Sequence, residues 1–169
     1  MGRLLVIDDD ARVRTGMRRY FEAHGYEVLE AETSVAAEHE FRVRPPDLAI
    51  LDYGLPDVTG LELMPVLKQI DERVPIVMLT GHGSIDLAVQ AVKQGAEDFL
   101  EKPVQLPALL EIVQRVLESR HAVDLTLDEA ERKHVETVLR HESGSVEAAA
   151  ARLGISRSAL YVRLKRYRG

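Results

Sequence analysis

The sequence predicts a doubly wound α/β domain with a five-stranded parallel sheet, followed by a small all-helical domain. Two observations predict this architecture. Short apolar runs alternate with helix-period segments over the first 120 residues, which is typical of a parallel sheet with helices on both faces. Beyond residue 127 the apolar residues recur at helical spacing only. We therefore expect domains at 1–120 and 128–169, joined by a linker at 121–127, where the pattern weakens.

Five short apolar runs are the expected strands: Leu4–Ile7, Glu27–Ala31, Leu48–Leu51, Ile76–Leu79 and Asp98–Leu100. Runs such as LLVI and IVML are continuously apolar, as strands buried on both faces of a sheet require. The segments between the strands carry helical spacing of apolar residues. Ser34 and Ser84 are expected to cap helix N-termini, and Gly25 and Gly95 to follow helix ends.

The second domain is expected to contain three helices, at Asp128–His141, Ser145–Leu153 and Ser156–Tyr167. Gly154 would supply the turn between the last two, because glycine adopts a left-handed backbone at little cost. Ser156 is a natural N-cap. The segment SVEAAAARLGISRSALYVRLKRYRG therefore has the pattern of a helix-turn-helix.

Composition and charge narrow the class of protein. Hydrophobic residues make up 46% and charged residues 30% of the chain, as in globular proteins. Cysteine is absent, which excludes disulfides and thiolate chemistry. No apolar run reaches the roughly 18 residues of a membrane span, so we expect a cytoplasmic protein. The net charge is −8 over residues 1–120 and +2 over residues 121–169. This asymmetry indicates either domains with different partners or a solvated, charged helix end.

Polar residues stand where four of the predicted strands end: Asp8-Asp9-Asp10, Asp52, Thr80 and Lys102. Ligands bind at this edge of an open parallel sheet. Carboxylates gathered there indicate a cation, and oxygen ligands suit Mg²⁺. An aspartate beside Mg²⁺ can attack phosphorus to form an aspartyl-phosphate, and a lysine and a threonine can donate to its oxygens. The alternative, that the first three aspartates only cap a helix, leaves the other strand ends unexplained.

Four segments, VIDDD, LDYGLPDVTGLEL, IVMLTGHG and DFLEKP, resemble in order and spacing the segments typical of response-regulator receiver domains. The resemblance covers about residues 3–120 and implies a flavodoxin-like fold. It also implies that Asp52 accepts the phosphoryl group and that Asp9 binds Mg²⁺ directly. Asp8 would help through water, and Gly54 through its backbone carbonyl.

The same resemblance implies that Thr80 and Lys102 contact the phosphoryl group and that Lys102–Pro103 is a cis peptide bond. Phe99 occupies the family's aromatic switch position, where it can move inward with Thr80 but lacks a tyrosine hydroxyl. A plain core role for Phe99 is the alternative. His82 lies beside the site and could influence phosphoryl hydrolysis, although a solvated loop position is the favoured interpretation.

The C-terminal segment resembles, over about residues 126–168, the Fis-type helix-turn-helix of NtrC-like regulators. This resemblance implies binding of double-stranded DNA as a homodimer, with the preceding helix contributing to the dimer. We expect Arg157, Ser158 and Tyr161 to contact base edges. Phosphate contacts are expected from the basic residues further along the helix, Arg163, Lys165 and Arg166.

The chain leaves no room for the central ATPase of NtrC-like proteins, so it resembles short two-domain regulators of the RegA/PrrA kind, unless a central domain has been deleted. We expect a transcription regulator phosphorylated by a sensor histidine kinase, with no enzyme activity beyond its own phosphoryl transfer and dephosphorylation. One alternative is a phosphorylation switch whose C-terminal helices dock a partner protein. A haloacid-dehalogenase-type hydrolase is disfavoured, because the second aspartate of that class is replaced by Gly54.

Overall fold

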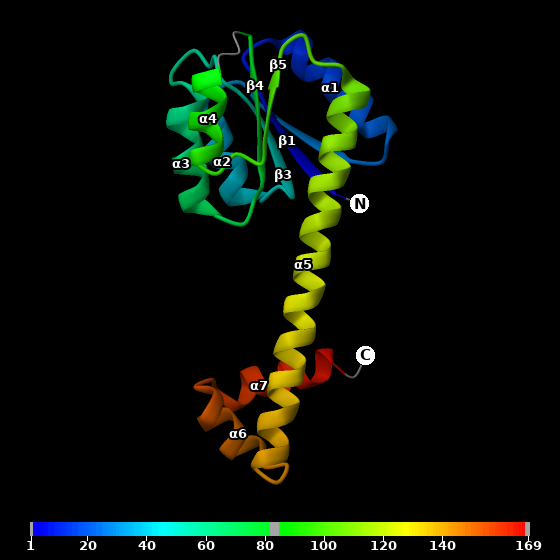
Figure 1. Ribbon diagram of the computed structural model, residues 1–169, viewed down its shortest axis with the longest axis vertical. Helices are drawn as coiled ribbons and strands as arrows, with labels where there is room; N and C mark the ends of the chain where they lie inside the picture. The colour runs from blue at the N-terminus through cyan, green and yellow to red at the C-terminus, as the bar shows by residue number, and fades with distance from the viewer. Residues whose placement is uncertain (1, 82–84, 168–169) are drawn as a thin grey trace. The chain divides into compact units, whose positions relative to one another are not determined.

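The computed structural model describes residues 2–81 and 85–167 (Figure 1). The chain divides into two compact units between Glu118 and Ser119. The first unit is an α/β domain and the second is made of helices. The predicted fold class is confirmed.

A five-stranded parallel sheet in the order β2-β1-β3-β4-β5 forms the centre of the first unit. Its strands are β1 (Arg3–Ile7), β2 (Glu27–Ala31), β3 (Leu48–Asp52), β4 (Ile76–Thr80) and β5 (Asp98–Glu101). The last three strands each extend one residue beyond the apolar run that predicted them. The added residues are polar, and they bring Asp52 and Thr80 to the carboxyl edge of the sheet while keeping them in the ladder.

Helices cover both faces of this sheet. They are α1 (Ala11–Ala23), α2 (Ser34–Val43), α3 (Gly60–Ile70), α4 (Ile85–Lys93) and the first part of α5 (Leu106–His141). In Figure 1, α2, α3 and α4 lie on one side of the sheet, with α1 and α5 on the other. Successive strand residues point to opposite faces, so Leu5 and Ile7 of β1 pack in the α2–α4 core, while Leu4 and Val6 pack in the core shared with α1 and α5.

Hydrogen bonds at the helix ends explain where the helices begin. The Asp10 side chain caps α1, and Thr59 and Glu62 form a capping box at α3. The prediction that Ser34 is an N-cap is wrong by one residue, because the Thr33 hydroxyl accepts from the amide of Ala36 and caps α2. The Ser34 hydroxyl donates to the Asp57 carboxylate instead. Ser84, the other predicted cap, lies outside the described residues.

Glycines follow two helix ends of the first unit, as predicted. Gly25 has a φ of 86° and Gly95 a φ of 95°, a left-handed backbone that favours glycine.

The second unit consists of the C-terminal part of α5, α6 (Val146–Leu153) and α7 (Arg157–Arg166). Ser145 and Ser156 cap α6 and α7, and Gly154 ends α6 in a left-handed conformation with φ of 67°. Ala149, Ala150 and Leu160 are fully buried in a core shared with Val135 and Val138 of α5. The small alanine side chains allow α6 to pack closely in this core.

Residues 121–127, the predicted linker, are helical and belong to α5. The helix continues through this segment because no glycine or proline interrupts the sequence from 119 to 141. The predicted linker is therefore a segment of helix and not a loop. The domain bounds 1–120 and 128–169 remain a prediction.

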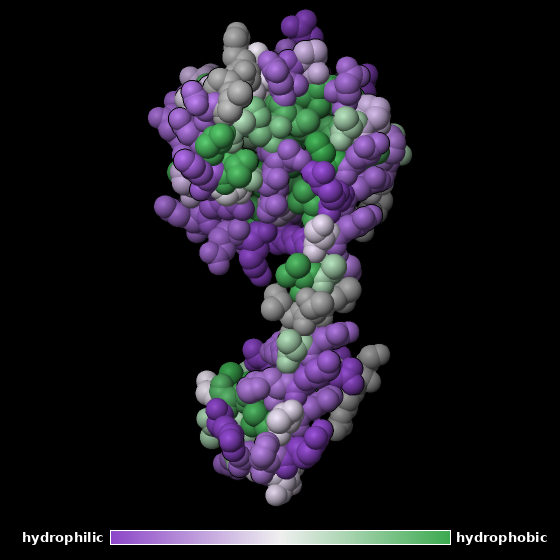
Figure 2. Space-filling view, viewed as in Figure 1, coloured by the Kyte–Doolittle hydropathy of each residue, from purple (hydrophilic) through white to green (hydrophobic). Residues whose placement is uncertain are grey.

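Hydrophilic side chains cover much of the visible surface of each unit, with hydrophobic residues gathered in patches between them (Figure 2). None of the helices in the described part of the chain combines the length and the apolar character needed to cross a membrane.

Candidate functional site

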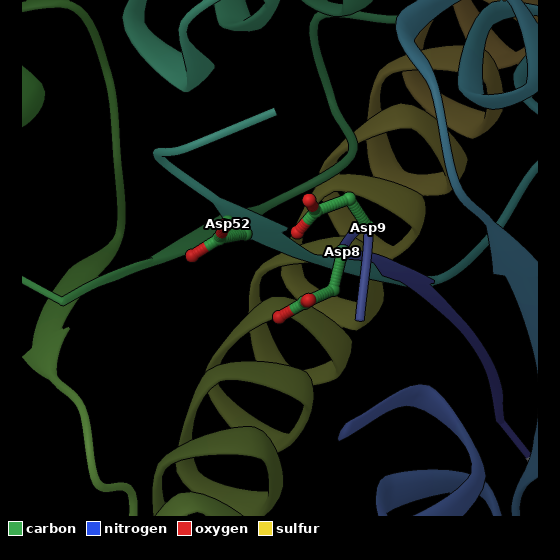
Figure 3. A group of neighbouring side chains, drawn as sticks. All are labelled: Asp8, Asp9 and Asp52. Atoms are coloured by element: carbon green, nitrogen blue, oxygen red, sulfur yellow. The ribbon is translucent and has the colours of Figure 1, made fainter. Parts of the chain in front are cut away.

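Three carboxylates meet where β1 and β3 end (Figure 3). Asp8 and Asp9 follow β1, and Asp52 is the last residue of β3. These strands are neighbours in register, with Ile7 opposite Leu51. One oxygen from each carboxylate lies within 4.8 Å of the others. Asp8 and Asp52 are only 1% and 5% exposed, whereas Asp9 is open to solvent, so the group has two buried members and one that faces water.

Lys102 neutralises part of this buried negative charge. Its Nζ lies 2.6 Å from Asp8 Oδ2 and 2.8 Å from Asp52 Oδ1. Burial raises the pKa of the Asp8 carboxyl, and the hydrogen bond from Lys102 opposes that rise without cancelling it. Burial acts to lower the pKa of Lys102, but the two aspartates outweigh it and the pKa is raised. The lysine is therefore held charged between two carboxylates.

The Lys102–Pro103 peptide bond that follows is cis, as predicted.

The loop from β1 to α1 is held by a residue that the sequence analysis missed. Arg14 lies one turn into α1, and its Nη1 donates to the carbonyl oxygens of Asp8 at 2.6 Å and Asp9 at 3.0 Å. The amide of Asp10 donates to Asp8 Oδ1 at 2.9 Å. Asp10 caps α1, but Asp8 and Asp9 turn their carboxylates to the site, so helix capping accounts for only one of the three aspartates.

The loop from β3 to α3 fixes the other side of the site. The amide of Gly54 donates to Asp52 Oδ2 at 3.1 Å. Asp57 accepts from the Ser34 amide at 3.0 Å and from its hydroxyl, which ties this loop to the start of α2. The hydrogen bond from the Ser34 hydroxyl lowers the pKa of Asp57 and keeps it ionised.

Gly60 begins α3 directly against the backbone of Asp52. A Cβ there would lie 2.7 Å from the carbonyl oxygen of Asp52 and 3.0 Å from Cα of Tyr53. Both neighbours are backbone atoms, which cannot move aside as a flexible side chain can. Only glycine therefore fits without displacing the strand end that carries Asp52.

We expect Gly60→Ala to lower the free energy of unfolding by about 1–3 kcal/mol, the usual cost of overpacking. Gly16→Ala is the matched control, since a Cβ at Gly16 on α1 meets nothing within 4 Å and alanine favours a helix over glycine. Urea unfolding should show the first variant destabilised and the second unchanged or stabilised. Equal stability of the two variants would contradict the close approach at Gly60.

The structure places Thr80 and Phe99 on the strands beside Asp52. Thr80 is fully buried at the end of β4, and its carbonyl accepts from the amide of Lys102 at 2.7 Å. Phe99 pairs with Met78 across β4 and β5 and packs, partly buried, against the core on the α2–α4 side. This position fits both a switch and a plain core residue, so its role stays a prediction. His82 lies outside the described residues.

The second unit presents α7 with one buried side and one exposed side. Leu160 is fully buried, with Leu164 and Tyr167 packed beside it. The predicted base-contacting residues Arg157, Ser158 and Tyr161, together with Lys165, are exposed. The exposed side is thus available to a ligand of the second unit.

Arg163 and Arg166 are paired within the second unit. Arg163 Nε lies 2.5 Å from Glu131 Oε1, and Arg166 Nη2 lies 3.3 Å from Glu131 Oε2. The hydrogen bond from Arg163 lowers the pKa of Glu131. No sequence motif marked Glu131, because it lies 32 residues before Arg163. Contacts of these two arginines with DNA phosphates stay a prediction. The Glu131 carboxylate would compete with the phosphates for both guanidinium groups.

Comparison with known proteins assigns both units. Residues 4–114 match the family model of the response regulator receiver domain. The chain belongs to the response regulator family. Residues 126–167 of this response regulator match the model described as bacterial regulatory protein, Fis family, so the receiver is followed by a Fis-type helix-turn-helix.

The response regulator is similar over nearly its whole length to proteins of two sizes. The photosynthetic apparatus regulatory protein RegA of Rhodovulum sulfidophilum is 32% identical over 163 residues, covering 93% of this chain and 87% of RegA. The C4-dicarboxylate transport transcriptional regulatory protein DctD of Pseudomonas aeruginosa is 33% identical over 156 residues, covering 90% of this chain and 34% of DctD. The chain spans 26–34% of the length of DctD and two further curated relatives.

A solved structure of similar extent is a response regulator protein from Burkholderia pseudomallei, with a phosphorylated aspartic acid, a calcium ion and citrate. It is 29% identical, with a TM-score of 0.65, and the match covers 95% of this chain and 97% of that one.

Proposed function

We propose that this response regulator is a DNA-binding transcription regulator whose receiver accepts a phosphoryl group on Asp52 from a sensor histidine kinase. The observation that carries the proposal is the Asp52 carboxylate, buried at a strand end, 2.8 Å from Lys102 and beside two further aspartates. That arrangement supplies a nucleophile, a fixed positive charge and ligands for a cation in one place. A regulator that binds chromosomal DNA would act in the cytoplasm.

The site residues divide the chemistry among them. An oxygen of Asp52 forms a bond to phosphorus while the bond from phosphorus to the donor's histidine nitrogen breaks. Lys102 Nζ and the Thr80 hydroxyl donate to the phosphoryl oxygens. Positioning and charge neutralisation are most of what phosphoryl transfer needs from a protein. The chain acts on its own Asp52 and needs no separate substrate pocket.

The three carboxylates fit a divalent cation. Asp9 would bind Mg²⁺ directly, Asp8 through water, and Asp52 and the Gly54 carbonyl would complete the protein's ligands. Carboxylates with room for water are the ligand set that Mg²⁺ prefers. When bound, the ion supplies positive charge to the phosphoryl oxygens. The observation that supports a cation site is the short distance between the three carboxylates, with one oxygen of each within 4.8 Å of the others.

Phosphorylation would reach the second unit through the switch residues. Thr80 and Phe99 would move toward the phosphate and change the surface made by α4, β5 and α5. We propose that this change alters dimerisation, so that a homodimer engages two half-sites spaced by a helical turn. The receiver would comprise residues 1–120 and the DNA-binding domain 128–169, with 121–127 between them.

The docking of a partner protein by α6 and α7 is the alternative to DNA binding, and it is not favoured. The match of residues 126–167 to the Fis family favours DNA. Salt dependence separates the two, because phosphate contacts make DNA affinity fall steeply as salt rises.

The test is selection from a random duplex DNA library in Mg²⁺, with and without beryllofluoride as the phosphoryl mimic. We expect enrichment of a sequence with two half-sites, and stronger binding with the mimic. Enrichment that ignores the mimic would separate DNA binding from the receiver and contradict the switch. Absence of enrichment in both conditions would contradict DNA sequence recognition.

A further inference from the structure

The surface of α7 is divided into three sides. Leu160 and Leu164 occupy the side packed on the core of the second unit. A second side is occupied by the pairing of Arg163 and Arg166 with Glu131 of α5. The third side carries exposed residues, Ser158, Tyr161, Val162 and Lys165.

Two large apolar residues stand on the third side. Val162 is 69% exposed and Tyr161 is 55% exposed. Ser158 lies at i−4 from Val162, and Lys165 lies at i+4 from Tyr161. Spacings of three residues, from Ser158 to Tyr161 and from Val162 to Lys165, join the two pairs into one patch, in which Tyr161 and Val162 stand side by side without facing one another. Hydrophobic and hydrophilic residues also stand side by side over the second unit in Figure 2. The sequence alone does not show that Val162 is exposed, because its exposure follows from the packing of α7.

We propose that Tyr161 and Val162 recognise thymine through its 5-methyl group in the major groove. This inference rests on the proposed DNA binding and names the base feature that α7 contacts. The thymine methyl is the apolar group that a base pair presents in the major groove, and apolar side chains contact it. An exposed valine gains by covering that methyl, since burial of apolar surface is favourable.

The charges around the apolar pair favour DNA over a second copy of this chain. Lys165 lies beside Tyr161, and Arg157 begins the helix one turn before it. Arg157 has a surface partner in Glu147 at 3.7 Å, with both side chains largely exposed, and such pairs are weak. A second α7 placed on this side would bring like charges together, whereas DNA phosphates flank the groove with negative charge.

The experiment uses the full chain with beryllofluoride and the duplex selected from the random library. Each thymine of that duplex is replaced in turn by deoxyuridine, which removes only the methyl group. We expect at least one position in each half-site where the replacement weakens binding about fourfold, the factor for burial of one methyl group. Val162→Ala should weaken binding to the thymine duplex and lose the discrimination at that position. If the valine contacts the methyl group directly, the effects of removing the methyl and of truncating the valine should not add, because each change removes the same contact.

Val43→Ala is the matched control, because Val43 on α2 is 61% exposed and lies in the receiver unit. It should keep the full sensitivity to deoxyuridine. Selection that succeeds while every deoxyuridine is tolerated would overturn this inference and leave the proposed DNA binding in place. A failed selection would overturn both. Sedimentation of the free protein adds a further arm: if Val162→Ala dissociates a dimer, the pair belongs to a protein interface and the inference is wrong.

Discussion

Asp52→Asn should leave the chain unable to take up a phosphoryl group from acetyl phosphate. The amide keeps the shape of the carboxylate at the end of β3, but it lacks the negatively charged oxygen that attacks phosphorus. We expect complete loss of the phosphorylated species in intact-protein mass spectra recorded with Mg²⁺. The response of DNA binding to beryllofluoride should disappear in the same variant.

Asp86→Asn is the matched control for this experiment. Asp86 is an exposed carboxylate in the first turn of α4, so the substitution changes the charge equally and leaves the carboxylate cluster intact. Phosphorylation of this control should match that of the unsubstituted chain. If Asp52→Asn still gains a phosphoryl group, another residue accepts it and the assignment of Asp52 is wrong.

Lys102→Met should cost about 3–5 kcal/mol of folding free energy in the absence of divalent cations, the range for breaking a buried ion pair. The substitution leaves Asp8 and Asp52 facing one another without the ammonium group that now lies between them. Added Mg²⁺ should recover part of the loss, because the cation supplies positive charge to the same carboxylates. Urea unfolding with and without Mg²⁺ measures both effects.

Acidification should also rescue the Lys102 variant. The pKa of Asp8 is raised by burial, so the folded state binds its proton more tightly than the unfolded state. The contribution of Asp8 to the stability of the metal-free protein therefore rises as pH falls through the Asp8 pKa. Removal of Lys102 takes away a contribution that lowers this pKa, so the gain should begin at higher pH in the variant.

Lys93→Met, on the exposed side of α4, provides the control for loss of one lysine. It should unfold at the same urea concentration as the unsubstituted chain. If Lys102→Met also unfolded at the urea concentration of the unsubstituted chain, the buried ion pairs would contribute nothing to stability. The interpretation that Lys102 neutralises Asp8 and Asp52 would then be wrong.

The strands and the carboxylate cluster could be predicted from the sequence because each depends on a local pattern. Continuous apolar runs such as Leu48–Leu51 identify buried strands, and the residue after each run then lies at the carboxyl edge of the sheet. The parallel order brings the ends of the neighbouring strands β1 and β3, and with them Asp8 and Asp52, to one edge of the sheet. Lys102 follows β5, beyond β4, and the contact of its side chain with both aspartates comes from the structure.

The supporting contacts could not be predicted in the same way. Glu131 meets Arg163 across 32 residues, and Ser34 meets Asp57 across 23. Such pairs depend on how the helices pack. The residues next to a glutamate in the sequence do not show which distant arginine it will pair with. Thr33 and Ser34 show the same limit at short range, because either hydroxyl could cap α2 and the position of Asp57 decides between them.

The hydrogen bonds of Arg14 bear on how readily the site exchanges a cation. They engage the backbone carbonyls of Asp8 and Asp9 and not their carboxylates. These two hydrogen bonds therefore hold the loop through its backbone, without occupying a carboxylate oxygen. Ordering a loop costs about 1–2 kcal/mol of conformational entropy per residue, and the Arg14 hydrogen bonds contribute to that ordering through the backbone. If the proposed Mg²⁺ binds there, it would meet a loop already held by Arg14, and its binding and release would not require the loop to refold in each round of signalling.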